Sequence, residues 1–320
     1  MGQTLSEPIT HKETSVCEGG GFKVAASSMQ GWRVTMEDAH TTLPVMPGDP
    51  KTAFFAVFDG HGGSVIAQHC SRNLHKSILA RPEYARGNYH DALQQGYLDL
   101  DAAMLADPLL KEEVAGSTAV SCLITSDTLY CANVGDSRAV ASVCGAAVAL
   151  STDHKPSLPA EKERIEAAGG WVEVNRVNGN LALSRAMGDF VFKKNPLKDP
   201  REQVVTAFPE VTVHAVTPDW EFVLLACDGI WDVLTSHEAV QFVRTRLASG
   251  SAPEDACEAL INRALAPDCQ MGGLGCDNMT VVLVCCSRDS TWRQFQEKCA
   301  RRSRDSSDSE DDDDEPKDLT

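Results

Sequence analysis

The stretch F-F-A-V-F-D-G-H-G-G, from Phe54 to Gly63, decides the fold and contains the first candidate functional residues. Its five apolar residues predict a strand that is buried on both faces. This strand runs directly into Asp59, Gly60 and His61. A carboxylate at the mouth of a buried strand is costly to desolvate unless a cation or a donor receives it. Asp59 therefore indicates either an ordinary Asp-Gly turn or a ligand for a cation.

Other acids lie at the ends of other predicted strands. Asp228 comes directly after the apolar run Phe222–Cys227, and Asp277 lies just before the run Met279–Cys286. Glu37 and Asp38 follow a predicted strand and turn, and Asp136 lies in the turn after Val134. Carboxylates that converge from separate strands suit hard cations such as Mg²⁺ or Mn²⁺, because these ions prefer oxygen ligands. Each acid alone could belong to a separate turn, but the set predicts a metal site.

The composition is that of a globular protein with a mildly acidic body. The 320 residues can bury a large core, and neither a membrane span nor a signal peptide is evident. The formal net charge is -17, of which the segment 305–320 contributes -8. A body without a basic excess argues against a nucleic-acid binder, including a two-metal nuclease.

The twelve cysteines indicate a reducing compartment. They are scattered through apolar runs and no CxxC pair occurs, so reduced thiols are expected rather than disulfides or a structural zinc site. We expect a cytoplasmic protein, with a nuclear or membrane-associated pool as an alternative.

The order of predicted elements favours an α+β fold. Strands come in short adjacent runs, with helices grouped in pairs between them, which favours antiparallel sheets flanked by helices. The expected strands are Phe22–Gln30, Ala53–Phe58, Ser117–Ile124, Thr128–Val134, Ala139–Val143, Phe222–Cys227 and Met279–Cys286. The expected helices are Val65–Leu79, Ala92–Leu105, Pro159–Ala168, Thr235–Leu247, Glu254–Ala266 and Ser290–Ala300.

The chain ends predict accessory segments. Residues 1–20 are expected to form an N-terminal arm, in which Gly2 and Ser6 fit the pattern for N-myristoylation. One acyl chain would give reversible membrane contact, and an unmodified terminus remains the alternative. Residues 302–320 form an acidic tail with little to bury, so disorder is expected. Ser307 and Ser309, each with an acid three residues on, are candidate targets of an acidophilic kinase.

The region from about Phe22 to Cys286 resembles the metal-dependent (type 2C) serine/threonine protein phosphatases. Seven motifs occur in order, and together they are far more specific than any one alone. They are R-V-T-M-E-D-A-H (33–40), V-F-D-G-H-G-G (57–63), G-S-T-A-V (116–120), A-N-V-G-D-S-R (132–138), L-A-L-S-R-A-M-G-D (181–189), A-C-D-G-I-W-D-V (226–233) and D-N-M-T (277–280).

The resemblance implies a fold and a domain division. The fold would be a sandwich of two antiparallel sheets flanked on both sides by pairs of helices. Residues 21–288 would form the catalytic domain, with a flap near 155–203, and residues 289–301 a C-terminal helix.

The resemblance also implies two Mg²⁺ or Mn²⁺ ions in the active site. Asp59 would bridge them, and a weaker third ion would be an additional possibility. Glu37 and the Gly60 carbonyl would hold one ion, while Asp228 and Asp277 would hold the other. The ligands of the third ion would be Asp136 and Asp228, with help from Asp232.

Three further residues have implied roles in catalysis. Arg33 would bind the phosphate, His61 would act as the general acid, and Asp38 would orient the attacking water. Alternatives from the residues alone are an ordinary surface arginine and a histidine that only hydrogen-bonds the site. The implied activity is hydrolysis of phosphoserine and phosphothreonine in proteins by direct attack of water, by a monomeric enzyme.

Two other interpretations are weaker. A catalytically dead scaffold should lack metal acids, yet all the principal ones are present. His69-Cys70 begins a cysteine-phosphatase-like pattern, but Lys76 stands where that chemistry needs arginine. Cys276, directly before Asp277, places a thiol near the expected metals and suggests sensitivity to oxidation.

Overall fold

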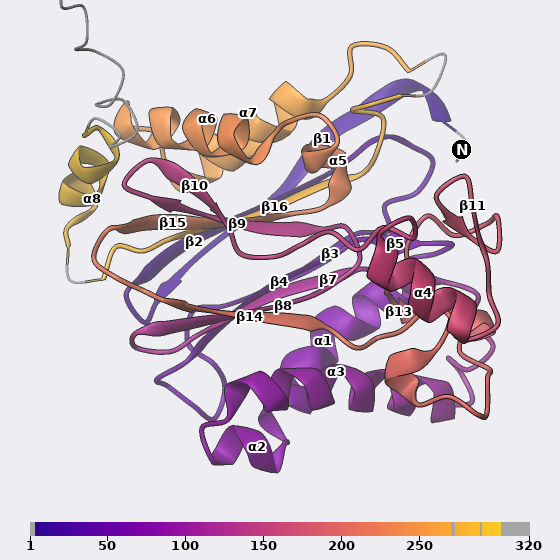
Figure 1. Cartoon of the computed structure of the whole chain (residues 1–320). Helices are drawn as coiled ribbons and strands as arrows, with labels where there is room; N and C mark the ends of the chain where they lie inside the picture. The colour runs from indigo at the N-terminus through magenta and orange to yellow at the C-terminus, as the bar shows by residue number, and fades with distance from the viewer. Residues whose placement is uncertain (1–3, 270–272, 289, 302–320) are drawn as a thin grey trace, which may run out of the picture.

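Two antiparallel sheets packed face to face form the centre of the structure, a computed structural model that describes residues 4–269, 273–288 and 290–301 (Figure 1). The first sheet has the order β1 (Thr4–Gly19), β2 (Phe22–Arg33), β16 (Met279–Cys285), β15 (Trp220–Ala226), β9 (Arg138–Val143) and β10 (Ala146–Ala149). The second has the order β14 (Glu210–Ala215), β8 (Thr128–Val134), β7 (Ala119–Ile124), β4 (Ala53–Phe58) and β3 (Ala39–Leu43).

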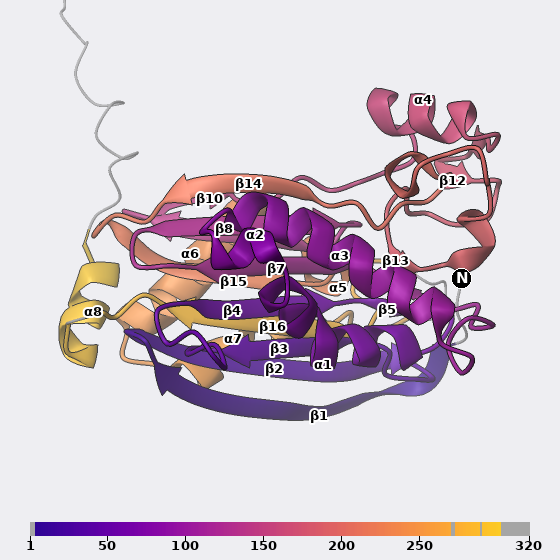
Figure 2. The same ribbon diagram turned by 90° about the horizontal axis from the view of Figure 1, so that it is seen from below.

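Helices cover the outer face of each sheet, as Figures 1 and 2 show. On the first sheet lie α6 (Ser236–Ala248), α7 (Pro253–Ala264) and α8 (Trp292–Cys299). On the second lie α1 (Val65–Leu79), α2 (Pro82–Ala85) and α3 (Tyr89–Ala106). The expected α+β sandwich is confirmed. None of the helices described is long and apolar enough to cross a membrane.

Strand β4 is buried on both faces because it faces two cores. Phe55 and Val57 point into the core between the sheets, whereas Phe54, Ala56 and Phe58 pack under α1 and α3. Alternation along a strand explains the split, since successive side chains point to opposite faces. Burial of both faces therefore fixes the register of β4 in the second sheet, and with it the position of Asp59 at the end of the strand.

Several local expectations are confirmed residue by residue. The bounds of β4, β8 and α1 agree with those predicted, and Thr235 and Glu238 form the capping box that begins α6. The pattern did not reveal β3 or β14. Strand β14 alternates exposed and half-buried residues at a sheet edge, so it has no continuous apolar run.

The segment expected as an N-terminal arm contains an edge strand. β1 pairs along β2 from Thr4 to Gly19, with irregular register near Ile9. Its side chains are exposed or half-buried, which gives an edge strand too polar to be recognised from hydrophobicity. Gly2 and the residues of the acidic tail, including Ser307 and Ser309, lie outside the described residues.

The expectation that all cysteines are reduced is wrong at one place. Cys269 and Cys276 form a disulfide, with their Cα atoms 6.0 Å apart. Both cysteines lie in the connection between α7 and β16, seven positions apart. Spacing in the sequence alone cannot reveal whether their Cβ atoms come within bonding reach.

The segment expected as a flap projects beside one end of the sandwich (Figure 2). It contains α4 (Pro159–Ala167) and the two-stranded β11 (Val172–Glu173) and β12 (Arg176–Val177). The short helices η1 (Phe190–Phe192) and η2 (Pro200–Glu202) follow. A small apolar cluster around Ile165 and Val205 holds this segment together.

A buried ion cluster anchors the same segment. Glu161 of α4, only 4% exposed, accepts hydrogen bonds from Arg185 at 3.1 Å and from Arg164 at 2.9 Å. Arg185 also donates to the carbonyl of Phe208. Burial raises the pKa of Glu161, but Arg185 and then Arg164 outweigh it and lower the pKa to about 2. Arg185 therefore has a structural contact here.

We predict that Glu161→Gln destabilises the protein in a pH-dependent way. Because the folded-state pKa lies below the ordinary value of 4.5, the ionised group stabilises the fold by roughly 3 kcal/mol at neutral pH. That contribution is lost as pH falls through about 4.5 toward about 2. Urea unfolding at pH 7 and pH 3 measures it, with the exposed Glu163→Gln as control. A stability gap independent of pH would contradict the assignment.

Candidate metal centre

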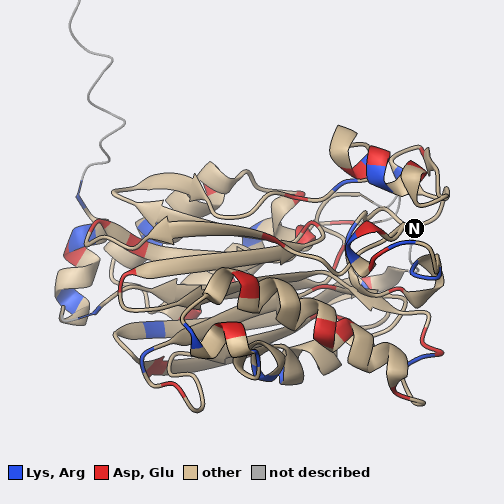
Figure 3. Ribbon diagram, turned by 60° about the horizontal axis from the view of Figure 1, so that its bottom comes forward, with Lys and Arg blue, Asp and Glu red and all other residues tan. Residues whose placement is uncertain are grey.

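A pocket of about 590 Å³ opens where the ends of the two sheets meet the α4 segment. Figure 3 shows several acidic positions along the ribbon at this end of the sandwich. Five acids line it, namely Glu37, Asp59, Asp136, Asp228 and Asp277. Other lining residues are Arg33, Gly60, His61, Thr118, Arg176 and Asn278. The sequence pattern predicted that the strand ends carrying Asp59, Asp228 and Asp277 converge. In the structure these ends lie around one pocket.

Each sheet contributes acids to the pocket. Asp59 links β4 to β5 (Gly60–His61), and Asp136 lies in the turn between β8 and β9. Asp228 begins the short helix α5 (Asp228–Trp231) directly after β15, and Asp277 directly precedes Asn278 and β16. The acids therefore face one another across the sandwich. Glu37 lies on the connection from β2 to β3, which joins the sheets.

Hydrogen bonds fix the two loops that carry Glu37 and Asp59. The side chain of Asn278 donates to the carbonyls of Gln30 and Thr35 and accepts from the backbone N–H of Glu37, each at 2.9 Å. Thr118 accepts from the Asp59 backbone N–H through its hydroxyl at 3.0 Å. These bonds hold the backbone of both loops in place before any ligand arrives.

Gly60 is required by the close approach of these loops. A Cβ built there would overlap the carbonyl oxygen of Glu37. The Glu37 carboxylate in turn accepts the Gly63 backbone N–H at 3.1 Å and the Thr35 hydroxyl at 2.8 Å. Glycine thus lets two loops that supply ligands lie against each other.

The electrostatics of the cluster call for positive charge. Burial raises the pKa of Asp59, and the negative charges of Asp228 and other acids raise it further. Burial and the charges of Asp136, Asp277 and Asp232 likewise raise the pKa of Asp228. Carboxylates buried side by side are stable as anions only with a compensating cation.

Asp38 is the most telling member of the cluster. Its two carboxylate oxygens are buried and accept no hydrogen bond at normal distance from the described residues, although the side chains of Thr280 and Cys227 lie close enough to lower its pKa. Burial outweighs these two neighbours and raises the pKa of Asp38 to about 7. One of its oxygens, one of Asp59 and the Cys227 sulfur all lie within 4.8 Å of one another. Burial also raises the pKa of the Cys227 thiol, so oxygen rather than sulfur would bind a cation here.

The observations therefore fit a hard divalent cation. The donors are carboxylate and carbonyl oxygens, and within the described part of the chain the buried oxygens of Asp38 accept no hydrogen bond at normal distance. Mg²⁺ and Mn²⁺ are bound by such donors together with water.

Two basic side chains contact the acids from the rim. Arg33 donates to one carboxylate oxygen of Asp277, whose other oxygen accepts the Asn278 backbone N–H at 2.7 Å. Lys155 donates to Asp136. The side chain of Arg33 is 38% exposed, so its remaining donors can reach a ligand in the pocket.

His61 is held by Asp189, a residue of the motif 181–189 for which no role was predicted. Its Nε2 lies 2.7 Å from Asp189 Oδ2. A Cβ at Gly116 would overlap both groups, so glycine leaves room for the pair. Burial lowers the pKa of His61, but the charge and hydrogen bond of Asp189 outweigh it and raise the pKa overall.

The pocket brings together most of the predicted site residues. Asp38 lies behind the lining, against Asp59. Asp232 ends α5 as an exposed residue outside the lining. Cys70 is buried within α1, so it does not lie in a loop of the kind that cysteine-dependent phosphatases use. The residues that sequence reasoning missed are Asp189, Lys155, Asn278, Thr118 and Arg176. Asp189, Asn278 and Thr118 stood inside quoted motifs, whereas nothing in the sequence distinguished Lys155 or Arg176.

Comparisons with known proteins agree with this geometry. The family model described as Protein phosphatase 2C matches residues 22–271. A probable protein phosphatase 2C of Caenorhabditis elegans is 58% identical over 94% of this chain and 85% of its own. Protein phosphatase 2C homolog 2 of Hypocrea jecorina is 46% identical over 94% of this chain and 71% of its own. The crystal structure of a Toxoplasma gondii phosphatase has a TM-score of 0.73 and 29% identity, covering 86% of this chain and 95% of that one.

The fold and the acidic pocket are those of a metal-dependent phosphatase. The chain belongs to the protein phosphatase 2C family, whose members are metal-dependent serine/threonine protein phosphatases acting on phosphorylated proteins. Family membership is thereby confirmed.

We predict that Asp59→Asn weakens metal binding but stabilises the metal-free protein. Removing the Asp59 charge relieves its repulsion with Asp228, Asp38 and the other acids, which raises the pKa of Asp59, while loss of a central ligand weakens Mn²⁺ binding at least tenfold. Thermal unfolding in chelator and calorimetric Mn²⁺ titration measure the two effects. The exposed Glu163→Gln, which removes the same charge elsewhere, should change neither. Undiminished Mn²⁺ binding would refute the site.

Proposed function

We propose that this phosphatase hydrolyses phosphoserine and phosphothreonine by direct attack of water, at a centre that holds two Mg²⁺ or Mn²⁺ ions. Such ions lower the pKa of a bound water to make it nucleophilic near neutral pH, and neutralise charge on the phosphoryl group. The observation that carries the proposal is the set of buried carboxylates whose pKa values are raised by burial and by one another.

The arrangement of the acids supports two positions on either side of Asp59. Glu37 and the Gly60 carbonyl lie on adjoining loops on one side, as their close backbone approach requires. Asp228 and Asp277 come from neighbouring strands β15 and β16 on the other. Asp59 would be the shared ligand.

A third, weaker position would use Asp136 and Asp228. The charge of Asp136 raises the pKa of Asp228, which shows that the two acids interact. Asp136 also accepts a hydrogen bond from Lys155, which competes for its charge and so favours weaker binding there. Asp232, exposed at the end of α5, would contribute through water.

Arg33 would bind the phosphoryl group. Its guanidinium lies at the rim of the pocket and is oriented by Asp277. A guanidinium can donate two parallel hydrogen bonds to phosphate oxygens, which places the phosphorus over the acids.

His61 would protonate the departing seryl or threonyl oxygen. Asp189 fixes its ring and, by raising its pKa, favours the protonated form that a general acid requires. Asp38 would hold the attacking water by accepting a hydrogen bond from it, since its buried oxygens accept none at normal distance from the described residues.

The sequence also suggests the substrates, the oligomeric state and the location of the protein. Phosphorylated proteins are the substrates, and nucleic acid is not expected to bind. We propose a monomer in the cytoplasm, where reversible membrane contact would depend on myristoylation of Gly2. Mass spectrometry of the native protein tests that modification.

A direct test of the function uses a phosphoserine peptide with and without Mn²⁺. We expect phosphate release only with Mn²⁺ for the wild type, and a loss of at least a hundredfold in kcat for Asp59→Asn, because the shared ligand is gone. Equal rates for the wild type with Mn²⁺, the wild type without Mn²⁺ and Asp59→Asn would contradict the mechanism.

The role of His61 is tested by varying the leaving group. We expect His61→Asn to lower kcat by about a hundredfold for a phosphoserine peptide, whose alkoxide needs a proton. p-Nitrophenyl phosphate, whose leaving group is stable as an anion, should lose far less. Asp189→Asn should show the same pattern in milder form, and His69→Asn on α1 neither effect. Equal losses on both substrates would assign His61 to positioning.

A further inference from the structure

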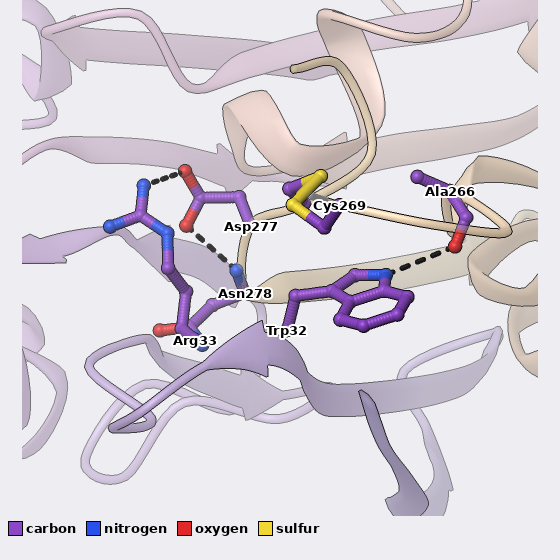
Figure 4. Close-up of a disulfide and its surroundings, with 7 residues drawn as sticks. Trp32, Arg33, Ala266, Cys269, Asp277 and Asn278 are labelled. Carbon is purple, nitrogen blue, oxygen red and sulfur yellow. Dashed lines mark hydrogen bonds and ion pairs between the residues drawn. A yellow bond between two sulfur atoms is a disulfide. The ribbon is translucent and has the colours of Figure 1, made fainter. Parts of the chain in front are cut away.

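The disulfide Cys269–Cys276 lies directly beside the metal centre (Figure 4). Cys276 immediately precedes Asp277, a proposed ligand. Both cysteines are nearly buried, at 5% and 7% exposure, and pack against Trp32. The disulfide therefore lies in the packed interior behind Asp277 and not on the protein surface.

Trp32 links the disulfide to Arg33, the residue that contacts Asp277. It directly precedes Arg33, and its indole N–H donates to the carbonyl of Ala266 at 3.0 Å. Figure 4 shows Trp32 and the disulfide on one side and the Arg33–Asp277 pair beside them. One small cluster thus supports both the phosphate-binding arginine and the ligand that it contacts.

The disulfide adds a covalent restraint to a turn that hydrogen bonds already hold on its other side. Ala266 N–H donates to the Gly275 carbonyl at 2.9 Å, and Gly275 adopts φ +81°, which favours glycine. Arg33 and the Asn278 backbone N–H contact the Asp277 carboxylate itself. A disulfide restricts the conformational freedom of the chain that it closes, here between positions seven apart.

We propose that the Cys269–Cys276 pair is a redox modification site whose oxidised form holds Asp277 and Arg33 in place. The inference rests on the proposed metal centre and names a way to regulate it. It also replaces the expectation of a lone reactive thiol at Cys276, because that sulfur is bonded to Cys269.

The chemistry is thiol–disulfide exchange with an external dithiol. The dithiol breaks the S–S bond through a mixed disulfide, gives up two electrons and becomes a disulfide itself. Cys269 and Cys276 each end with a proton on sulfur. The reverse exchange, with an oxidised dithiol, restores the crosslink.

Reduction should loosen the turn and weaken the metal site without removing any ligand. Groups that orient ligands typically change metal affinity 10- to 100-fold. We expect reduction to weaken Mn²⁺ binding about tenfold. Other buried thiols are poor candidates for the response, since burial raises the pKa of Cys227 and Cys257 and keeps them unreactive.

The test is calorimetric Mn²⁺ titration of the full chain, as oxidised protein and after dithiothreitol treatment and anaerobic desalting. Alkylation and mass spectrometry report the state of the pair. We expect about tenfold weaker binding after reduction, and the same weaker binding for Cys269→Ser whether reduced or not. Cys17→Ser, a half-buried cysteine on β1, should keep the full response. Circular dichroism checks that Cys269→Ser folds.

Three outcomes would overturn the inference. They are a pair that alkylates fully before reduction, equal Mn²⁺ affinity in both states, and an unchanged redox response in Cys269→Ser. Should Cys269→Ser fail to fold, the two states of the wild type alone decide. If the oxidised wild type does not bind Mn²⁺ at all, the proposed metal centre fails instead.

Discussion

The structure is organised around the cost of burying several carboxylates in one place. Asp38, Asp59 and Asp228 lie where two sheets end, and burial together with mutual repulsion raises the pKa of each acid. A fold can tolerate such a cluster only if the surrounding elements are rigid enough to hold it and a cation can compensate it. The sandwich supplies the rigidity, because β4 is buried on both faces and fixes the register up to Asp59.

The rest of the pocket follows from this constraint. Asn278 ties the segment from Gln30 to Glu37 to the turn at Asp277, so loops from opposite ends of the sequence move as one. Arg33 and His61 are each oriented by an acid, Asp277 and Asp189. Phosphate binding and proton donation are therefore positioned by residues that the metal acids or their neighbours already fix.

Much of this was predictable from the sequence, for identifiable reasons. β4 and α1 have strong patterns that match their surroundings, and the acids follow or precede apolar runs whose ends a sandwich must bring together. The site residues with family motifs were found in the same way. Polar edge strands such as β1 and β14 have no such signal, because half their residues face solvent.

Contacts between distant segments could not be predicted from local patterns. Lys155 reaches Asp136 from the segment that leads to α4, and Asp189 reaches His61 across 128 residues. The Cys269–Cys276 disulfide is a short-range case, since it joins residues seven positions apart, but spacing does not say whether their Cβ atoms lie within bonding reach. In each case the folded chain determines which two residues contact each other. The residue type alone therefore does not predict the contact.

The central claim is most directly tested by anomalous diffraction from crystals grown with Mn²⁺. The account predicts two manganese peaks on either side of the Asp59 carboxylate, one near Glu37 and the Gly60 carbonyl and the other near Asp228 and Asp277. Peaks confined to other parts of the surface, or no peak beside Asp59 in crystals of active enzyme, would contradict it.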